Sequence, residues 1–207
     1  GVWSTPTLLD EDNINTPANE GTAILNSSGN IIYFTRCPME KKKQLGCQIF
    51  EAKKKGKGWG IPELIDIASD SFTVGHPSLS ANELELYFSS NMPGGYGGKD
   101  IWVIKRSTKS KPWGKPENLG PSINTEGDEM YPFIREDGVL YFSSNGHIGM
   151  GGLDIFKVEK VGDTWGTPEN MKYPINSEAD DFGIIFLGTK EEGYFSSNRK
   201  GGRGNDD

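Results

Sequence analysis

The sequence lacks several features that mark common classes of function. It contains no run of about 20 apolar residues, so it gives no reason to expect a membrane-spanning helix. Only two histidines and two cysteines occur, and no CxxC pair, GxxxxGKS/T motif or Ser-His-Asp ordering is present. Zinc, nucleotide and catalytic-triad chemistry are therefore not indicated, and no cofactor is expected. Basic residues are outnumbered, with 22 Lys and Arg against 29 Asp and Glu and a net charge of -7. This balance argues against a nucleic-acid partner.

What the sequence does contain is an internal repeat. The string Tyr-Phe-Ser-Ser-Asn occurs three times, and a degenerate copy precedes it, with a spacing of about 53 residues throughout. The four copies lie at 33–37, 87–91, 141–145 and 194–198. A second landmark, Trp-x-x-Pro, holds the same period and begins at Trp3, Trp59, Trp113 and Trp165. Two landmarks that share one period predict a repeat architecture.

Each repeat contains four segments with the composition of short strands. In the third repeat, the apolar segment 130–134 is followed by an Asp-Gly turn and then by segment 139–144, which is rich in β-formers. A glycine-rich loop leads to segment 154–158, in which apolar and polar residues alternate. Segment 164–168 is expected to form the outermost strand, where Pro168 would cost no ladder hydrogen bond. No segment shows the period of an amphipathic helix.

The repeat predicts an all-β fold, a β-propeller built of four-stranded antiparallel blades. A solenoid would have a shorter period, and a sandwich would not repeat in sequence. One propeller domain, or an excerpt of one, is expected over residues 1–207. Its repeat units are approximately 10–62, 66–116, 120–168 and 172–207, the last being incomplete. Either the N-terminal strand closes the last blade of a four-bladed ring, or the chain is part of a larger ring, which we favour.

The repeat also resembles a known family. Tyr-Phe-Ser-Ser-Asn is followed by Gly-Gly-Tyr-Gly-Gly-Lys-Asp-Ile-Trp at 94–102, by Trp-Gly-Lys-Pro-Glu-Asn-Leu at 113–119 and by Ile-Asn-Thr at 123–125. This pattern resembles the PD40 or WD40-like propeller repeat of OmpA-family envelope lipoproteins, of the kind associated with the type IX secretion system. The resemblance implies a periplasmic, outer-membrane-associated protein with envelope or secretion-system partners. In that family a separate OmpA-like domain binds peptidoglycan, so no such binding is assigned to these residues.

Two cysteines, Cys37 and Cys47, flank a turn-rich and lysine-rich segment and are a candidate disulfide. The alternative is a pair of buried free thiols. A disulfide would favour an oxidising compartment such as the periplasm.

Residues that recur in every repeat are interpreted as architecture, and residues confined to one repeat as candidates for function. On this criterion Asp100, Asp154 and Asp207 pin the glycine-rich loops through backbone hydrogen bonds. The alternative is a calcium site beside the loop carbonyls. The recurring tryptophans are expected to pack between blades, and a sugar-stacking platform is the alternative.

Three acidic residues stand at the start of the first strand of a repeat: Glu20, Glu129 and Asp181. Because the first strand of a propeller blade lines the central channel, these carboxylates are expected around one channel mouth. We interpret them as solvated capping residues. Cation binding and general acid–base catalysis, as in glycoside hydrolysis, are the alternatives.

Candidate partner-binding residues are basic or aromatic. Lys41, Lys42 and Lys43 form a local basic patch on an acidic chain, together with further lysines at 53, 54, 55 and 57. Such a patch suits an acidic partner, and a solvated loop is the alternative. Tyr96 and Trp102 are candidate aromatic contacts.

The function expected from the sequence is a non-catalytic scaffold that binds other envelope proteins. The alternatives are a glycan-acting propeller enzyme, working at the channel mouth, and a carbohydrate-binding module. The secretion role follows from the resemblance alone, because one fold hosts many functions.

Overall fold

The computed structural model describes residues 4–38 and 45–201, and these residues form an all-β structure without helices. The all-β prediction is confirmed. Within this part of the chain no helix is long and apolar enough to cross a membrane.

The strands form four antiparallel sheets and one small hairpin. The first sheet contains β1 (Asn19–Leu25), β2 (Ile31–Cys37), β3 (Gln48–Lys55), β4 (Gly58–Trp59) and β5 (Glu63–Leu64). The second contains β6 (Val74–Leu79), β7 (Glu85–Ser90), β8 (Asp100–Lys105) and β9 (Glu117–Asn118). The third contains β10 (Glu129–Ile134), β11 (Leu140–Ser144), β12 (Asp154–Val158) and β15 (Glu169–Asn170), with the hairpin of β13 (Lys160–Val161) and β14 (Thr164–Trp165) beside it. The fourth contains β16 (Asp181–Phe186) and β17 (Gly193–Ser197).

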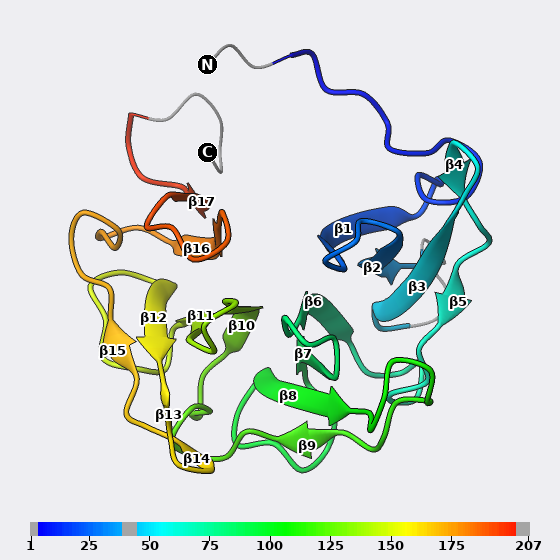
Figure 1. Ribbon diagram of the computed structural model, residues 1–207. Helices are drawn as coiled ribbons and strands as arrows, with labels where there is room; N and C mark the ends of the chain where they lie inside the picture. The colour runs from blue at the N-terminus through cyan, green and yellow to red at the C-terminus, as the bar shows by residue number, and fades with distance from the viewer. Residues whose placement is uncertain (1–3, 39–44, 202–207) are drawn as a thin grey trace.

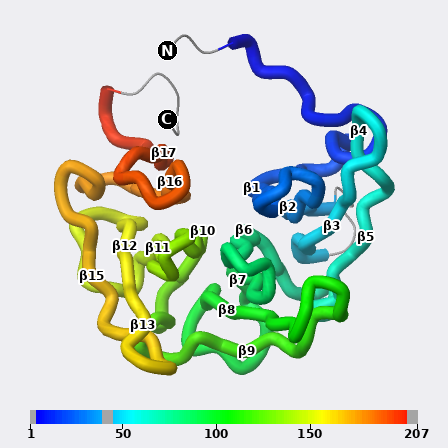
Figure 2. Tube along the Cα trace, viewed as in Figure 1, coloured from blue at the N-terminus to red at the C-terminus, as the bar shows by residue number. Residues whose placement is uncertain are grey.

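The four sheets lie around a common centre in the manner of propeller blades (Figures 1 and 2). In both views β1, β6, β10 and β16 lie nearest the centre, and the later strands of each sheet lie progressively farther out. The first strand of every repeat is therefore the innermost one, as the sequence predicted.

Alternation along the second strand explains why Tyr-Phe recurs. Consecutive strand residues point to opposite faces of a sheet. Tyr87 of β7 packs in a core with Phe142 of the third sheet, whereas Phe88 packs in a core with Tyr33 of the first sheet. The second blade thus covers an apolar face of both neighbours, and the recurring Tyr-Phe pair supplies the side chains that do so.

The Ile-Asn-Thr string joins one sheet to the next. Asn124, which precedes β10, accepts the backbone N–H of Ile101 in β8 at 2.7 Å and donates to its carbonyl at 3.0 Å. Asn176 does the same to Ile155 of β12, at 2.8 Å for both bonds. A side-chain amide thereby replaces a strand partner and satisfies two buried backbone groups.

The prediction that segment 164–168 forms the outermost strand is wrong. Thr164–Trp165 pairs with β13 in the hairpin, and β15, immediately after Pro168, pairs with β12. The N–H of Gly166 donates to the carbonyl of Glu159 at 2.9 Å and joins the two ends of the hairpin. Since Pro168 has no N–H to donate, the ladder with β12 begins only after it.

Candidate functional site: the central channel

The four innermost strands share one irregularity. The register of each shifts relative to the second strand: between Gly21 and Ala23, Gly75 and Ser78, Met130 and Phe133, and Phe182 and Ile185. A β-bulge of this kind redirects a side chain and is common beside functional sites.

Every bulge holds a residue with a positive φ angle, and its identity differs from blade to blade. The angles are 34° at Thr22, 56° at His76, 52° at Tyr131 and 66° at Gly183. Only glycine adopts this conformation without strain, and a β-branched threonine is an outlier there. The backbone feature is therefore architectural, since all four blades have it. The residue at the positive-φ position, by contrast, is different in each blade.

Two cavities lie against these bulges. The smaller, of ≈ 150 Å³, takes wall residues from all four innermost strands, and apolar surface predominates in both cavities. The larger, of ≈ 420 Å³, shares Thr22, His76 and Tyr131 with it and is bordered by Glu20, Lys99 and the cysteines Cys37 and Cys47. The three shared residues thus stand where the two cavities adjoin.

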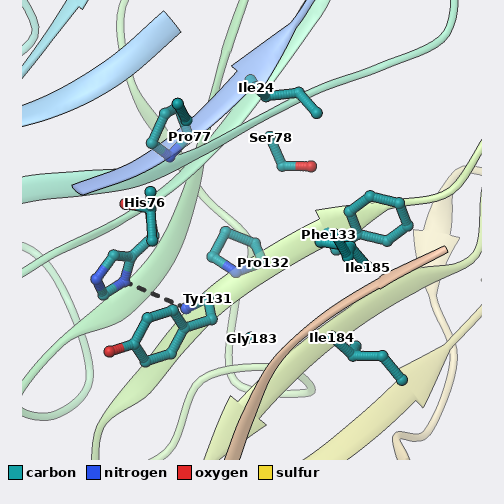
Figure 3. A pocket seen from close by; sticks show the side chains of 12 residues that line it. Ile24, His76, Pro77, Ser78, Tyr131, Pro132, Phe133, Gly183, Ile184 and Ile185 are labelled. Carbon is teal, nitrogen blue, oxygen red and sulfur yellow. Dashed lines mark hydrogen bonds between the residues drawn. The ribbon is translucent and has the colours of Figure 1, made fainter. Parts of the chain in front are cut away.

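A row of stacked rings forms one side of the channel. The ring of His76 lies on that of Tyr131, with centroids 4.0 Å apart and planes inclined by 12° (Figure 3). Tyr131 in turn contacts Phe182 of the fourth sheet, with centroids 5.0 Å apart. The backbone N–H of Tyr131 donates to Nδ1 of His76 at 3.3 Å. Nδ1 is therefore the acceptor nitrogen, and the neutral ring carries its proton on Nε2.

The surroundings of His76 keep it neutral. Burial lowers the pKa of its imidazole to about 4, and the positive charge of Lys99 adds to the effect. Its backbone N–H donates to Oγ1 of Thr35 at 3.0 Å, and the same hydroxyl lies 3.0 Å from that of Thr22. These bonds fix β6 against the first sheet, so the ring is held in place by its own backbone.

The recurring acids are structural, and our interpretation of Glu129 and Asp181 as solvated caps is wrong. Both are 0% exposed. Glu129 accepts the N–H and hydroxyl of Thr125 at 2.8 and 2.6 Å and the hydroxyl of Ser144 at 2.6 Å. Glu20 makes the same contacts with Thr16, and an ion pair with Arg36 at 2.9 Å. The acid therefore holds together the loop that enters each innermost strand.

Asp181 has the same position in the fourth sheet. It accepts the N–H and hydroxyl of Ser177 at 2.6 and 2.9 Å and forms an ion pair with Arg199. Burial alone would raise the pKa of Asp181, but hydrogen bonds from Ser197, Arg199 and Ser177 outweigh it and hold the pKa below its ordinary value. The ion pair with Arg199, added to the two hydroxyl groups, distinguishes this blade from the third.

The loop aspartates accept backbone donors. Asp100 accepts the N–H groups of Tyr96 and Gly97 at 2.7 and 3.2 Å. Asp154 accepts those of Met150 and Gly151 at 2.8 and 3.0 Å. Both carboxylates thus act on the loop as the structural interpretation proposes. Asp207 lies outside the described residues, and among those that are described no group of three or more acidic, His or Cys side chains is arranged to hold a metal ion.

The remaining candidates are distributed over the molecule. Cys37 and Cys47 are joined in a disulfide, with Cα atoms 4.0 Å apart. Tyr96 is 50% exposed on its loop. Trp102 is only 6% exposed and donates its indole N–H to the carbonyl of Ser90 at 3.3 Å, so its choice as a partner-binding residue is wrong. The aromatic residue at this position of β8 fills the core toward the first sheet. Lys41, Lys42 and Lys43 lie outside the described residues, whereas Lys53 is exposed on β3.

The bulge residues were not recognised from the sequence. A signal was present, because His76-Pro77 and Tyr131-Pro132 place a proline inside a segment that otherwise has strand composition. Proline within a strand marks an edge or a bulge. Both segments form innermost strands, and each contains a register shift, so the prolines mark bulges and not edge strands.

No protein-family model matches the chain, and no curated protein sequence matches it either. Solved structures do. TolB from Acinetobacter baumannii has a TM-score of 0.53 at 12% identity, over 87% of this chain and 41% of that one. A puromycin-hydrolyzing peptidase from Mycobacterium tuberculosis has a TM-score of 0.54 at 15% identity, over 83% of this chain and 24% of that one. A prolyl endopeptidase has a TM-score of 0.51 at 14% identity, over 86% and 23%.

The chain spans less than half the length of each of these proteins. Their low identity to this chain carries information on the fold alone, and they include both TolB and peptidases. The comparisons and the arrangement of sheets agree on one conclusion. The chain has a propeller-like, all-β fold.

Proposed function

We propose that this chain is a non-catalytic, protein-binding propeller of the bacterial cell envelope, and that its partners engage the central channel. The observation that carries the proposal is the set of four bulges. One repeated backbone feature presents Thr22, His76, Tyr131 and Gly183, a different residue in each blade. Variation at a fixed position is what selective binding requires. The recurring acids Glu20, Glu129 and Asp181, by contrast, accept hydrogen bonds from the loop that precedes each innermost strand.

The finer assignment follows from the repeat sequence. We propose that the propeller belongs to a peptidoglycan-anchored, OmpA-like lipoprotein associated with type IX secretion and located at the periplasmic side of the outer membrane. The resemblance of the repeat supports it, and the structural similarity to TolB is compatible with it. The disulfide between Cys37 and Cys47 is in keeping with an oxidising compartment.

Photo-crosslinking in the cells that naturally produce the protein would test the proposal. A photoreactive phenylalanine analogue replaces Tyr131 in the channel, or Tyr173, which is 78% exposed, as the matched control. We expect protein adducts of defined mass from position 131 that are absent from position 173. Identical adducts from both positions, or none from position 131, would contradict channel binding.

A separate assay on purified protein tests the enzyme alternative. Purified wild-type protein and the Glu129→Gln variant are assayed on glycan and peptide substrates. Because Glu129 accepts three donors while buried, an amide there also leaves hydrogen bonds unmade, and we expect about 1–3 kcal/mol of destabilisation. We expect no hydrolysis of these substrates by either protein. Hydrolysis by the wild type that disappears in a folded Glu129→Gln variant would favour an enzyme.

A further inference from the structure

We propose that the channel binds an extended peptide segment in which an acidic residue adjoins an apolar one. Lys99 and His76 hold the carboxylate in the larger cavity, and the neighbouring apolar side chain enters the smaller one. This inference rests on the proposed function, since it names the partner chemistry of the same channel.

The larger cavity offers two donors to an anion. Lys99 immediately precedes β8, and its side chain is 33% exposed. Its Nζ lies 3.9 Å from Oδ2 of Asp128, which is beyond hydrogen-bond distance, so the cation is only loosely paired. Because Nδ1 of His76 accepts the N–H of Tyr131, the Nε2–H is the group of this ring that can donate to a ligand. An ammonium group and a neutral N–H that border one cavity suit a carboxylate.

The other carboxylate at the larger cavity does not compensate Lys99. Glu20 forms an ion pair with Arg36 at 2.9 Å and accepts the hydroxyl of Thr16. Its charge is therefore balanced within the first blade. Among the described residues that border this cavity, Lys99 is the cation left available to a ligand.

The smaller cavity suits a single apolar side chain. Its apolar walls come from Ile24, Pro77, Pro132, Phe133, Ile184 and Ile185 (Figure 3). Its volume of ≈ 150 Å³ is of the size that accommodates one benzene-like group. The polar groups that would orient a sugar ring by hydrogen bonds are few on these walls. A leucine, isoleucine or phenylalanine side chain is the better occupant.

The arrangement of the two cavities favours a peptide over a compact molecule. Both cavities border Thr22, His76 and Tyr131. A ligand that fills both cavities must therefore place its charged group on one side of these three residues and its apolar group on the other side. Adjacent side chains of an extended peptide point in opposite directions, with a rise of about 3.3 Å per residue. An acidic residue next to an apolar one therefore meets both requirements.

The test selects peptides without assuming a natural partner. A random heptapeptide phage library is panned on the whole folded chain, and enriched sequences are synthesised for titration calorimetry. We expect an Asp or Glu next to Leu, Ile or Phe, and binding about tenfold weaker to the Lys99→Gln variant, as the loss of a charge-assisted hydrogen bond would produce. The same weakening is expected when the peptide carboxylate is replaced by an amide.

Two further variants keep the test specific. His76→Asn retains an acceptor for the N–H of Tyr131 at a position where asparagine tolerates positive φ, yet it cannot reach a ligand as histidine does. It should also bind more weakly. Lys105→Gln is the control, because Lys105 ends the same strand β8, is not among the residues that line either cavity, and pairs with Glu117 at 2.6 Å. It should bind as the wild type does, and thermal melts of all three variants confirm that they fold.

The inference is overturned if enriched peptides lack a carboxylate, if none are enriched, or if Lys99→Gln binds them as tightly as the wild type. The proposed function fails separately. If crosslinks from position 131 persist while no acidic-apolar peptide binds, the channel is a protein site of different chemistry.

Discussion

Trp113 lies edge-on to Tyr33, with ring centroids 6.3 Å apart and planes inclined by 75°, although the two residues belong to neighbouring sheets. Trp165 and Tyr87 repeat the contact one blade later, at 6.2 Å and 76°. A cation covers each indole: the guanidinium of Arg106 lies 4.2 Å from the ring of Trp113. The two most regular landmarks of the sequence therefore meet each other at the first two boundaries between sheets.

Replacing Trp113 by alanine should lower the free energy of unfolding by about 2–3 kcal/mol, because the indole is partly buried and its aromatic contact is lost. Urea unfolding at neutral pH measures the change. The control is Tyr173→Ala, whose side chain is largely exposed, and its effect should stay within about 0.5 kcal/mol. Equal effects of the two changes would contradict a role for Trp113 between sheets.

Gly97→Ala should destabilise the protein by more than about 2 kcal/mol. A Cβ there would lie 2.3 Å from the carbonyl oxygen of Thr125 and 2.5 Å from that of Gly127, and both are backbone atoms of the loop before β10. Gly21→Ala is the matched control, since nothing lies within 4 Å of its added Cβ. Thermal melts compare the two variants. A Gly97→Ala protein as stable as Gly21→Ala would show that the loops do not pack this closely.

His76 should make stability depend on pH below neutrality. The folded-state pKa of about 4 lies under the ordinary value of 6.5. Between these values the unfolded chain binds a proton that the folded chain does not, so stability is retained above pH 6.5 and falls as the pH drops toward 4. We expect His76→Asn to reduce the loss between pH 7 and pH 4 by about 3 kcal/mol. Urea unfolding at both pH values measures this. Carboxylates contribute equally in both proteins, and identical losses would contradict the neutral, buried imidazole.

Removing the disulfide by the double change Cys37→Ser and Cys47→Ser should lower the free energy of unfolding by about 2–3 kcal/mol, because the short loop that it closes becomes free in the unfolded chain. A thiol titration of the unfolded, unreduced protein should find no free cysteine. Two reactive thiols in that titration would count against the disulfide and against the compartment inferred from it.

The repeat was sufficient to predict the sheets but not the channel. The position of β7 follows from Tyr-Phe-Ser-Ser, because alternating large side chains and a recurring period state which residues face which neighbour. The outermost strand was misplaced by a few residues because strand composition at Thr164–Trp165 is equally compatible with a local hairpin. Such local choices depend on which backbone groups find partners.

The candidate site was predictable only in part. The first strands were correctly expected at the channel, but Glu129 and Asp181 were expected in solvent because their charge outweighed every other signal in the sequence. Their neighbours Thr125 and Ser177, four residues earlier, supply the bonds that permit burial. His76 gave no sequence signal for its stacking on Tyr131, since the two are 55 residues apart and only the bulges bring them together.

The bulges also bear on how such a protein diversifies. The bulge at His76 or Tyr131 is part of the strand and occurs in all four described blades. Duplication of a blade therefore duplicates the bulge together with the residue at its positive-φ position. A single codon change at that position then alters the surface that the innermost strands present, while the hydrogen-bond ladders and tryptophan contacts stay unchanged. Duplication followed by one substitution per copy would be enough to generate new preferences for what enters the centre.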